Sequence, residues 1–198
     1  MASVLVLLRH AERLSIPEGD IGNDVPITAA GAIATKEFAR KLNPPVVSVE
    51  TSPIYRCVQT AKLVSEIHGI SGSNVRSNVL LGDPGFFIED GEVAWQSWLK
   101  HGSEKVNQYL LTGSDNWPGF RPFNVAIASM VSSIRNVLED RSPGTVVWVT
   151  HDTILATFAS RVLQNKLSLD DWPEFLGSLT INMNNDRVLN YCYSKNSV

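Results

Sequence analysis

Short apolar runs that end abruptly at polar or charged residues constrain the fold of this 198-residue chain more than any other feature. The first run covers residues 3–8 and stops at Arg9 and His10, and a second run covers 145–149; between them, residues 46–50 are also expected to form a strand. Runs of this length are typical of strands that are buried on both faces, as the strands of parallel sheets are. We therefore expect each run to form an inner strand.

Segments with helical periodicity separate these runs. One helix is expected to begin at Thr28 and to turn four apolar residues inward: Ile33, Phe38, Ala39 and Leu42. Further helices are expected over about 53–68, 122–138 and 154–162, a weaker strand over 75–81, and a hairpin of 178–183 with 187–193. Strand followed by helix, three times over, predicts an α/β fold of three layers: a mostly parallel central sheet with helices on both faces.

The carboxyl ends of the predicted strands carry the titratable residues. In sheets of this kind, ligands bind outside those ends. We expect residues 9–13, 52–56 and 150–152 to meet there. Their cationic and titratable side chains are Arg9, His10, Arg13, Arg56, His151 and Asp152. Arg56 lies in the first turn of a helix, where a cation opposes the helix dipole, so it either faces solvent or meets an anion.

Residues 82–121 differ from the rest of the chain because they are rich in aromatic side chains. Two short helices are expected, at about 92–100 and 103–111. We interpret the segment as a cap or lid inserted over the ligand-binding edge of a single domain that spans residues 1–198. Two interpretations stay open: aromatic side chains such as Trp95 and Trp98 contact the organic part of a ligand, or they bury each other in a satellite core.

Charge and composition narrow the class of protein. The net charge is −3 and the pI about 5.8, which argues against a nucleic-acid binder. The two cysteines, Cys57 and Cys192, are too few for a disulfide framework. No apolar stretch is long enough for a membrane span and no export signal is visible, so we expect a cytoplasmic protein.

The expected cluster suits phosphoryl transfer. That reaction needs a nucleophile in line, cations on the equatorial oxygens and an acid for the leaving oxygen. Arginine binds phosphate through two parallel hydrogen bonds, and a neutral imidazole can act as a covalent nucleophile. A metal site is the rival use of His and Asp. Because the adjacent arginines would repel a metal cation, we expect neither a metal nor another cofactor.

Four motifs occur in order along residues 4–157: Leu8-Arg9-His10-Ala11-Glu12-Arg13, Asp24-x-Pro26-Ile27-Thr28-x-x-Gly31, Ser52-Pro53-x-x-Arg56-x-x-Gln59-Thr60-Ala61 and Val149-Thr150-His151-Asp152. Together they resemble the motifs of the histidine phosphatase superfamily, also called the phosphoglycerate-mutase-like superfamily. The resemblance implies that His10 is the nucleophile that becomes phosphorylated. It also implies that Arg9, Arg56 and His151 hold the phosphoryl oxygens.

The proton donor separates the two branches of that superfamily. The mutase-like branch uses a carboxylate in the middle insertion, whereas the acid-phosphatase branch uses the Asp after the late His and carries an extra Arg three places after the nucleophile. This chain has Asp152 and Arg13 at the latter positions, while its Ser-Pro and Gln-Thr-Ala helix resembles the mutase-like branch. We expect Asp152 to be the acid and Arg13 to bind phosphate; Asp83 and Glu89 are the alternative donors.

The predicted function is hydrolysis of a phosphomonoester, on a phosphorylated small molecule or a phosphoprotein, through a phosphohistidine on His10. Two alternatives stay open: phosphoglycerate-mutase-type phosphoryl transfer, and a phospho-ligand binding module without turnover. The sequence departs from the family pattern in three respects. Ala11 replaces the usual Gly after the nucleophile, and Ser15 stands where the acid-phosphatase motif has Pro. The residues after Glu12 also differ from the mutase signature.

Overall fold

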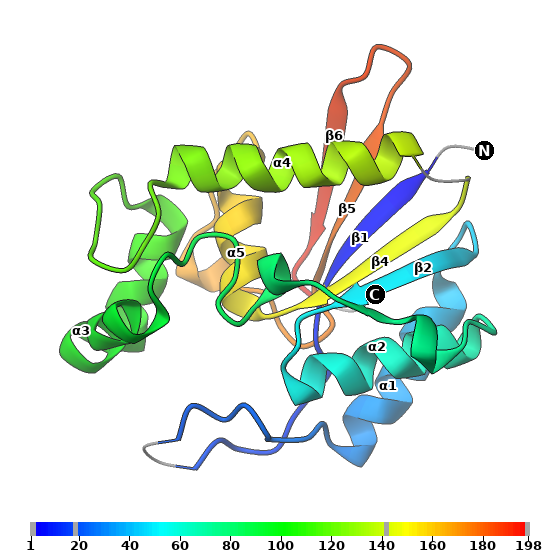
Figure 1. Cartoon of the computed structure of the whole chain (residues 1–198), viewed down its shortest axis with the longest axis horizontal. Helices are drawn as coiled ribbons and strands as arrows, with labels where there is room; N and C mark the ends of the chain where they lie inside the picture. Colours follow the sequence, from blue (N-terminus) through cyan, green and yellow to red (C-terminus); the bar gives the residue numbers. More distant parts are fainter. Residues whose placement is uncertain (1–2, 18–19, 141–142, 197–198) are drawn as a thin grey trace.

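The computed structural model describes residues 3–17, 20–140 and 143–196, and in these ranges a six-stranded sheet lies between two layers of helices (Figure 1). The strands are β1 (Val4–Arg9), β2 (Val46–Thr51), β3 (Arg76–Ser77), β4 (Thr145–Thr150), β5 (Ser178–Met183) and β6 (Leu189–Ser194). The helices are α1 (Ala29–Lys41), α2 (Tyr55–Ile67), α3 (Gly91–Thr112), α4 (Phe123–Asp140) and α5 (Asp152–Val162). None of the helices in this part of the chain is both long enough and apolar enough to cross a membrane.

The sheet is mixed and mostly parallel. Its strand order is β3-β2-β4-β1-β5-β6, and the first four strands run parallel to one another. Strand β5 is antiparallel to β1 and forms a hairpin with β6. The predicted α/β architecture and the C-terminal hairpin are therefore confirmed.

The apolar run of β1 is explained by burial on both faces. Leu5 and Leu7 belong to the core beneath α4 and α5, whereas Val6 and Leu8 belong to the core beneath α1 and α2. All four side chains are at most 4% exposed. Each contributes about 2 kcal/mol through loss of apolar surface to water. This burial on both faces places β1 inside the sheet, so that Arg9 and His10 at its carboxyl end lie at the sheet edge where ligands are expected.

Two predictions from the sequence are wrong: the strand over 75–81 and the inward position of Ile33 in α1. The strand expected over 75–81 is paired only at Arg76–Ser77, because the side chain of Asn78 accepts a hydrogen bond from the Leu80 amide and begins a 3-10 turn. In α1, Ile33 is 62% exposed instead of inward. A Cβ on Gly31 would lie 2.5 Å from the Glu12 carbonyl oxygen, so this close backbone contact, not the apolar pattern, sets which face of α1 is buried.

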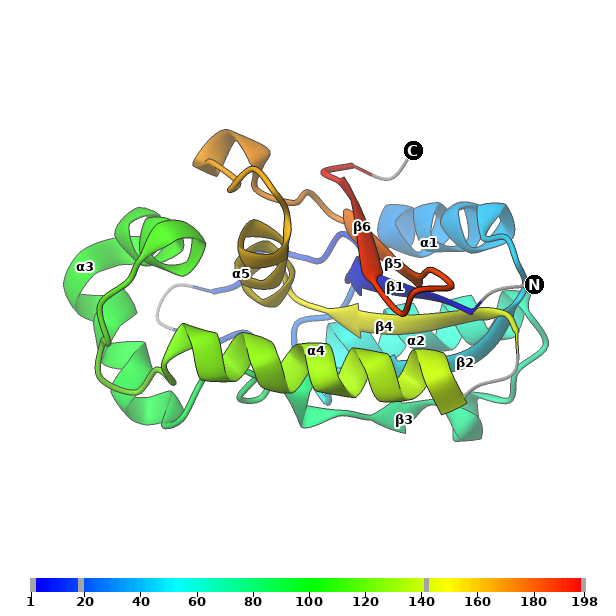
Figure 2. The same cartoon turned by 90° about the horizontal axis from the view of Figure 1, so that it is seen from above.

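Helix α3 lies beyond the carboxyl ends of β1 and β4 and packs against α5 (Figure 2). It is interrupted at Gly102, which has a φ of 77° and a ψ of 162°, so it consists of the two helical pieces that the sequence predicts. Phe86, Phe87 and Phe120 of the inserted segment join the main core and do not form a satellite core.

Arg161, in the last turn of α5, holds the end of α3 in place. Its Nη2 donates to the carbonyl oxygens of Leu110 and Gly113 at 3.0 and 3.1 Å. Its guanidinium also lies 3.6 Å from the centroid of the Phe123 ring. These contacts satisfy carbonyl groups that the end of a helix otherwise leaves unpaired.

We predict that Arg161→Met lowers the free energy of unfolding by about 2 kcal/mol, because charge-assisted hydrogen bonds at a buried helix end are lost. Urea unfolding measures this directly. The control is Arg40→Met, on the exposed last turn of α1, which should change the free energy by less than about 0.5 kcal/mol. Equal effects of the two changes would contradict the capping role.

Candidate active site

The segments that follow β1, β2 and β4 meet at one edge of the sheet. The His10 amide donates to the Thr150 carbonyl and the Ser52 amide to the Val149 carbonyl, both at 2.9 Å, so the strand pairing continues past the ends of the strands. These bonds bring the rings of His10 and His151 to a centroid distance of 5.5 Å. Residues that are 141 positions apart in the sequence thus form one site.

Arg56 lies between the two histidines. Its Nε donates to His10 Nε2 at 3.1 Å and its Nη2 to His151 Nδ1 at 3.3 Å, while its Nη1 donates to the Gly22 carbonyl at 2.6 Å. The residue is only 9% exposed, so its cation points into the protein, not to solvent. In the described part of the chain no carboxylate forms an ion pair with Arg56. A buried guanidinium with only neutral partners is suited to bind an anion.

The hydrogen bonds of His10 fix its tautomer. Its Nδ1 lies 2.8 Å from the Ala11 carbonyl oxygen, which can only accept, so Nδ1 carries the hydrogen. The lone pair is therefore on Nε2, where it accepts from Arg56. Burial, followed by the nearby His151, lowers the pKa of His10 well below its usual value. The imidazole is therefore neutral at pH 7, and its unprotonated nitrogen is Nε2.

His151 has the opposite tautomer. Because its Nδ1 accepts from Arg56, its Nε2 carries the hydrogen and donates to Ser52 Oγ at 2.9 Å. Burial, followed by the Arg56 charge, lowers the pKa of His151 to about 3. A Cβ at Gly82, where φ is 145°, would lie 2.6 Å from both the His151 ring and Ser52 Oγ. Ser52 and Gly82 thus position His151, a role that the sequence analysis did not assign to them.

Cys57 lies next to His151 but is not a rival nucleophile. Its Sγ is 3.5 Å from His151 Nε2. Burial raises the pKa of the Cys57 thiol to about 12. Since the thiolate is the reactive form, this thiol is inert at neutral pH.

Arg9 borders the site on the side of the segment 172–175. Its Nη2 forms an ion pair with Asp152 at 3.0 Å, and its Nη1 donates to the Pro173 carbonyl at 2.6 Å. The guanidinium lies 4.3 Å from the centroid of the Phe175 ring. The Arg9 Nε is buried and has no hydrogen-bond partner among the described residues. One donor of Arg9 is therefore free while its other nitrogens are held.

Asp152 is engaged by its neighbours. Its Oδ2 accepts from Arg9 and from Trp172 Nε1 at 3.3 Å, and its Oδ1 accepts from the Thr153 amide at 2.9 Å. Burial alone raises the pKa of Asp152, but the Arg9 charge and the hydrogen bond from the Thr153 amide outweigh it, so the pKa is below its ordinary value. In this arrangement Asp152 is an ionised partner of Arg9.

Of the three remaining residues that the sequence suggested for the site, only Asp83 lies beside Arg56 and His151. Arg13 is half-buried, and its Nη1 donates to the Leu14 carbonyl at 2.8 Å and not to His10 or His151. Asp83 is exposed, with a φ of 57°, and lines a cleft together with Arg56 and His151. Glu89 is exposed and does not line this cleft.

The cleft has a volume of about 330 Å³. Polar groups on its lining include Arg56, His151 and Asp83, and much of the remaining wall is apolar or aromatic. The inserted segment 82–121 supplies Phe87, Trp95 and Trp98 to that wall. Among the described residues, no group of three or more His, Cys, Asp or Glu is arranged to hold a metal ion.

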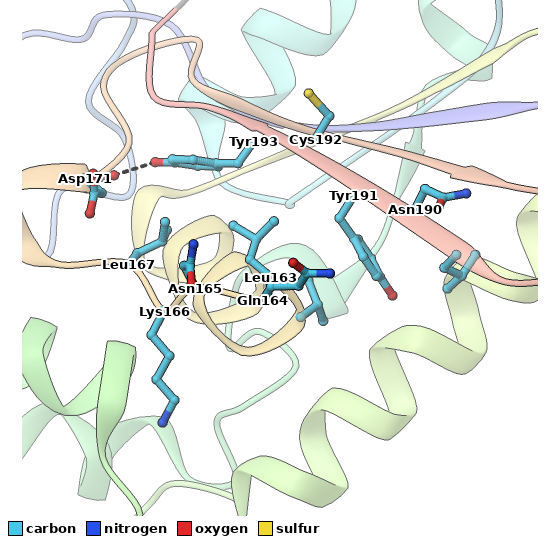
Figure 3. A pocket seen from close by; sticks show the side chains of 12 residues that line it. Leu163, Gln164, Asn165, Lys166, Leu167, Asp171, Asn190, Tyr191, Cys192 and Tyr193 are labelled. Carbon is cyan, nitrogen blue, oxygen red and sulfur yellow. Dashed lines mark hydrogen bonds between the residues drawn. The ribbon is translucent and has the colours of Figure 1, made fainter.

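A second cavity, of about 730 Å³, lies between the end of α5 and the edge strand β6 (Figure 3). Tyr191 and Tyr193 line it, and Tyr193 donates to the Asp171 carbonyl at 2.6 Å. Lys166 is its only Lys or Arg among the described residues, and none of the clustered histidines and arginines lines it. Its larger volume therefore does not make it the site of phosphoryl chemistry.

Motif residues outside the cleft hold the loop that follows His10. The Ala11 amide donates to Thr60 Oγ1 at 3.1 Å, and Thr28 Oγ1 donates to Glu12 Oε2 at 2.6 Å. The Ile27 amide donates to Gln59 Oε1 at 2.9 Å. The spacing of these residues signalled a motif, but only the structure shows that they fix the backbone beside His10.

A parallel-sheet edge with two neutral histidines, the buried Arg56 and the partly buried Arg9 is suited to bind a phosphoryl group. The sequence profile of the histidine phosphatase superfamily (branch 1) matches residues 5–183. The chain belongs to this superfamily, as its motifs predicted. Comparison with curated protein sequences finds no match.

Solved structures with a similar fold include phosphatases and a mutase. Phosphoserine phosphatase from Entamoeba histolytica, as a mutant in complex with phosphoserine, has a TM-score of 0.62 at 17% identity, over 99% of each chain. Phosphoglycerate mutase from Bacillus anthracis has a TM-score of 0.62 at 17% identity, over 99% of this chain and 95% of that one. Mycobacterial glucosyl-3-phosphoglycerate phosphatase has a TM-score of 0.60 at 16% identity, over 98% of each chain. At this identity the similarity shows the fold.

The two histidines predict a specific loss of stability in acid. Their pKa values are lowered in the folded protein, whereas in the unfolded chain they take up protons near pH 6.5. The unfolded state therefore binds more protons as the pH falls below about 6.5, and folding is disfavoured. Between pH 7.5 and 5.5 the pair should contribute a loss of roughly 2–3 kcal/mol.

Urea unfolding at these two pH values, for the natural protein and for His10→Gln/His151→Gln, measures this contribution. The double variant should lose less stability between the two pH values than the natural protein does. If both proteins show the same pH dependence, the histidines titrate normally in the folded state and our description of the site is wrong.

Proposed function

We propose that this protein hydrolyses phosphomonoesters through a phosphohistidine formed at Nε2 of His10. The observation that carries the proposal is the position of that nitrogen. Its lone pair faces a buried guanidinium that has no carboxylate partner in the described part of the chain. A phosphoryl group bound by Arg56 would place its phosphorus within reach of Nε2.

The reaction takes two displacements at phosphorus. In the first, the Arg56 Nε–H leaves His10 Nε2 and donates to the phosphoryl group instead. The Nε2 lone pair then forms a bond to phosphorus while the bond to the ester oxygen breaks and that oxygen takes a proton from an acid. In the second, the oxygen of a water molecule forms a bond to phosphorus while the bond to Nε2 breaks, and the water loses its proton to the same carboxylate. Inorganic phosphate leaves and His10 is neutral again.

The equatorial oxygens would receive hydrogen bonds from Arg56 and from the unpaired Nε of Arg9. His151 would donate as well in the tautomer that carries its hydrogen on Nδ1, once the anion takes the place of the Arg56 contact and Nε2 accepts from Ser52. Each such donor is worth on the order of 3 kcal/mol in the transition state.

Asp83 is the better placed acid. It lines the cleft beside Arg56 and His151, whereas Asp152 is held in an ion pair with Arg9 that keeps it ionised. The left-handed backbone of Asp83, with a φ of 57°, is uncommon outside glycine and is often found at functional sites. We therefore propose Asp83 as the acid, and Asp152 as the residue that positions Arg9.

Hydrolysis is favoured over mutase-type transfer by the charge of the cleft. A mutase has to hold a second anionic group of its substrate beside the reacting phosphate. Arg56 is the only Lys or Arg that lines the cleft in the described part of the chain, and the phosphoryl group occupies it. We propose that the segment 82–121 forms one wall of this cleft and separates it from solvent.

His10→Gln should reduce kcat/KM for 4-nitrophenyl phosphate by at least about 1,000-fold, because the covalent route is lost. Rapid acid-free quenching with a ³²P-labelled ester should trap label that is stable to base and labile to acid in the natural protein only. If the natural protein traps no label and releases no nitrophenol between pH 5 and 8, it is a binding module.

Substitution of the two aspartates should separate their roles. Asp83→Asn should reduce kcat for the hydrolysis of alkyl phosphates by on the order of 100-fold. It should reduce kcat for 4-nitrophenyl phosphate far less, because a good leaving group needs no proton. Asp152→Asn should slow both substrates by a similar factor, since it loosens Arg9, which acts on the phosphoryl oxygens in either case. If Asp152→Asn is the variant that selects between leaving groups, the two roles are exchanged.

A further inference from the structure

We propose that the cleft selects phosphate monoesters of aromatic or arylalkyl alcohols, with Trp95 and Trp98 as the residues that determine this specificity. The inference rests on the proposed function, because it concerns the organic part of the ester that His10 attacks. It names a class of substrate that the phosphoryl-binding groups alone do not define.

The walls of the cleft are apolar close to the phosphoryl-binding groups. Ile54, which precedes α2, and Ile154 of α5 line the same cleft as Arg56 and His151. Opposite the sheet edge, α3 contributes Trp95 and Trp98. A cleft of about 330 Å³ is at the small end of the range for sites that bind drug-sized ligands, and it suits one or two rings beside a phosphate.

The two tryptophans form a rigid surface and not a loose patch. Their rings stack with centroids 6.2 Å apart and planes inclined by 23°. Trp98 also stacks on Phe120 at 5.7 Å, and Phe120 stacks on Phe87 at 6.2 Å. The series of rings therefore runs from the buried core to the cleft, where Trp95 and Trp98 are only half-buried. Rings held in this way can stack on a ligand with little loss of conformational entropy.

The charges in the cleft disfavour substrates that carry a carboxylate in addition to the phosphate. A carboxylate beside the phosphate would need a second cation, and Arg56 is the only Lys or Arg on the lining among the described residues. Asp83 also lines the cleft and would repel a carboxylate. A neutral apolar group avoids both costs and covers the tryptophan rings.

The test compares esters whose leaving alcohols are all alkyl, so that the chemistry at phosphorus is matched. The probes are 2-phenylethyl phosphate, glycerol 1-phosphate and 3-phosphoglycerate, and kcat/KM is measured for each. We expect 2-phenylethyl phosphate to exceed 3-phosphoglycerate by at least tenfold. Trp95→Ala should lower the ratio of kcat/KM for 2-phenylethyl phosphate to that for glycerol 1-phosphate by about tenfold, because the ring contact is available only to the aromatic ester.

Two further variants keep the result interpretable. Trp98→Leu retains apolar volume beside Phe120 and should also lower the preference for the aromatic ester. Trp117→Leu is the matched control, because Trp117 stacks on Tyr109 in the same segment and does not line the cleft. Thermal unfolding of each variant shows that it is folded.

The outcomes separate this inference from the proposed function. Turnover of all three esters without preference for the aromatic one, or a preference that Trp95→Ala and Trp117→Leu change equally, overturns the specificity while the phosphatase stands. Absence of turnover with every ester overturns the proposed function, and the specificity with it.

Discussion

The buried guanidinium of Arg56, held between two uncharged imidazoles, is the interaction on which the rest of the site depends. It orients His10 through Nε2 and His151 through Nδ1 at the same time. A cation near the start of a helix is unfavourable by itself, because the helix dipole is positive there. The arrangement is stable while both rings stay neutral, and burial keeps them neutral by lowering the pKa of each. An anion bound at this point would meet a cation already placed and desolvated.

The fold supplies that arrangement through backbone contacts close to each side chain. Thr60 holds the chain after His10, and Ser52 and Gly82 hold His151. The parallel pairing of β1, β2 and β4 brings the three segments to one edge. The inserted segment adds an aromatic wall, in contrast to the charged and polar groups at the sheet edge. This wall lies on α3, whose end is hydrogen-bonded to Arg161 of α5. In the reaction that we propose, the phosphoryl group is bound by charge and the remainder of the substrate by apolar contact.

The convergence of His10, Arg56 and His151 could be predicted because it follows from topology. Apolar runs identify inner strands, and parallel strands present their carboxyl ends at one edge. The buried face of α1 could not be predicted from its apolar residues, because the contact between Gly31 and the Glu12 carbonyl decides it. That contact joins parts of the chain with no periodic relation.

The environment of Asp152 could not be predicted from the sequence either, because its neighbours come from a distant segment without a periodic pattern. Trp172, Pro173 and Phe175 surround the pair of Asp152 and Arg9, yet they lie in an irregular segment with no motif or period. Sequence identified Asp152 as a carboxyl group beside a histidine. Only the geometry shows that it is already engaged, and this moves the proposed acid to Asp83.

A crystal structure with orthovanadate would show directly whether His10 is the nucleophile, because vanadate adopts the five-coordinate geometry of phosphoryl transfer. We predict that vanadium is bonded to Nε2 of His10, that its equatorial oxygens contact Arg9, Arg56 and His151, and that its apical oxygen faces Asp83 and the tryptophan wall. Vanadate bonded to a different side chain, or bound in the cleft with His10 still paired to Arg56, would contradict this prediction.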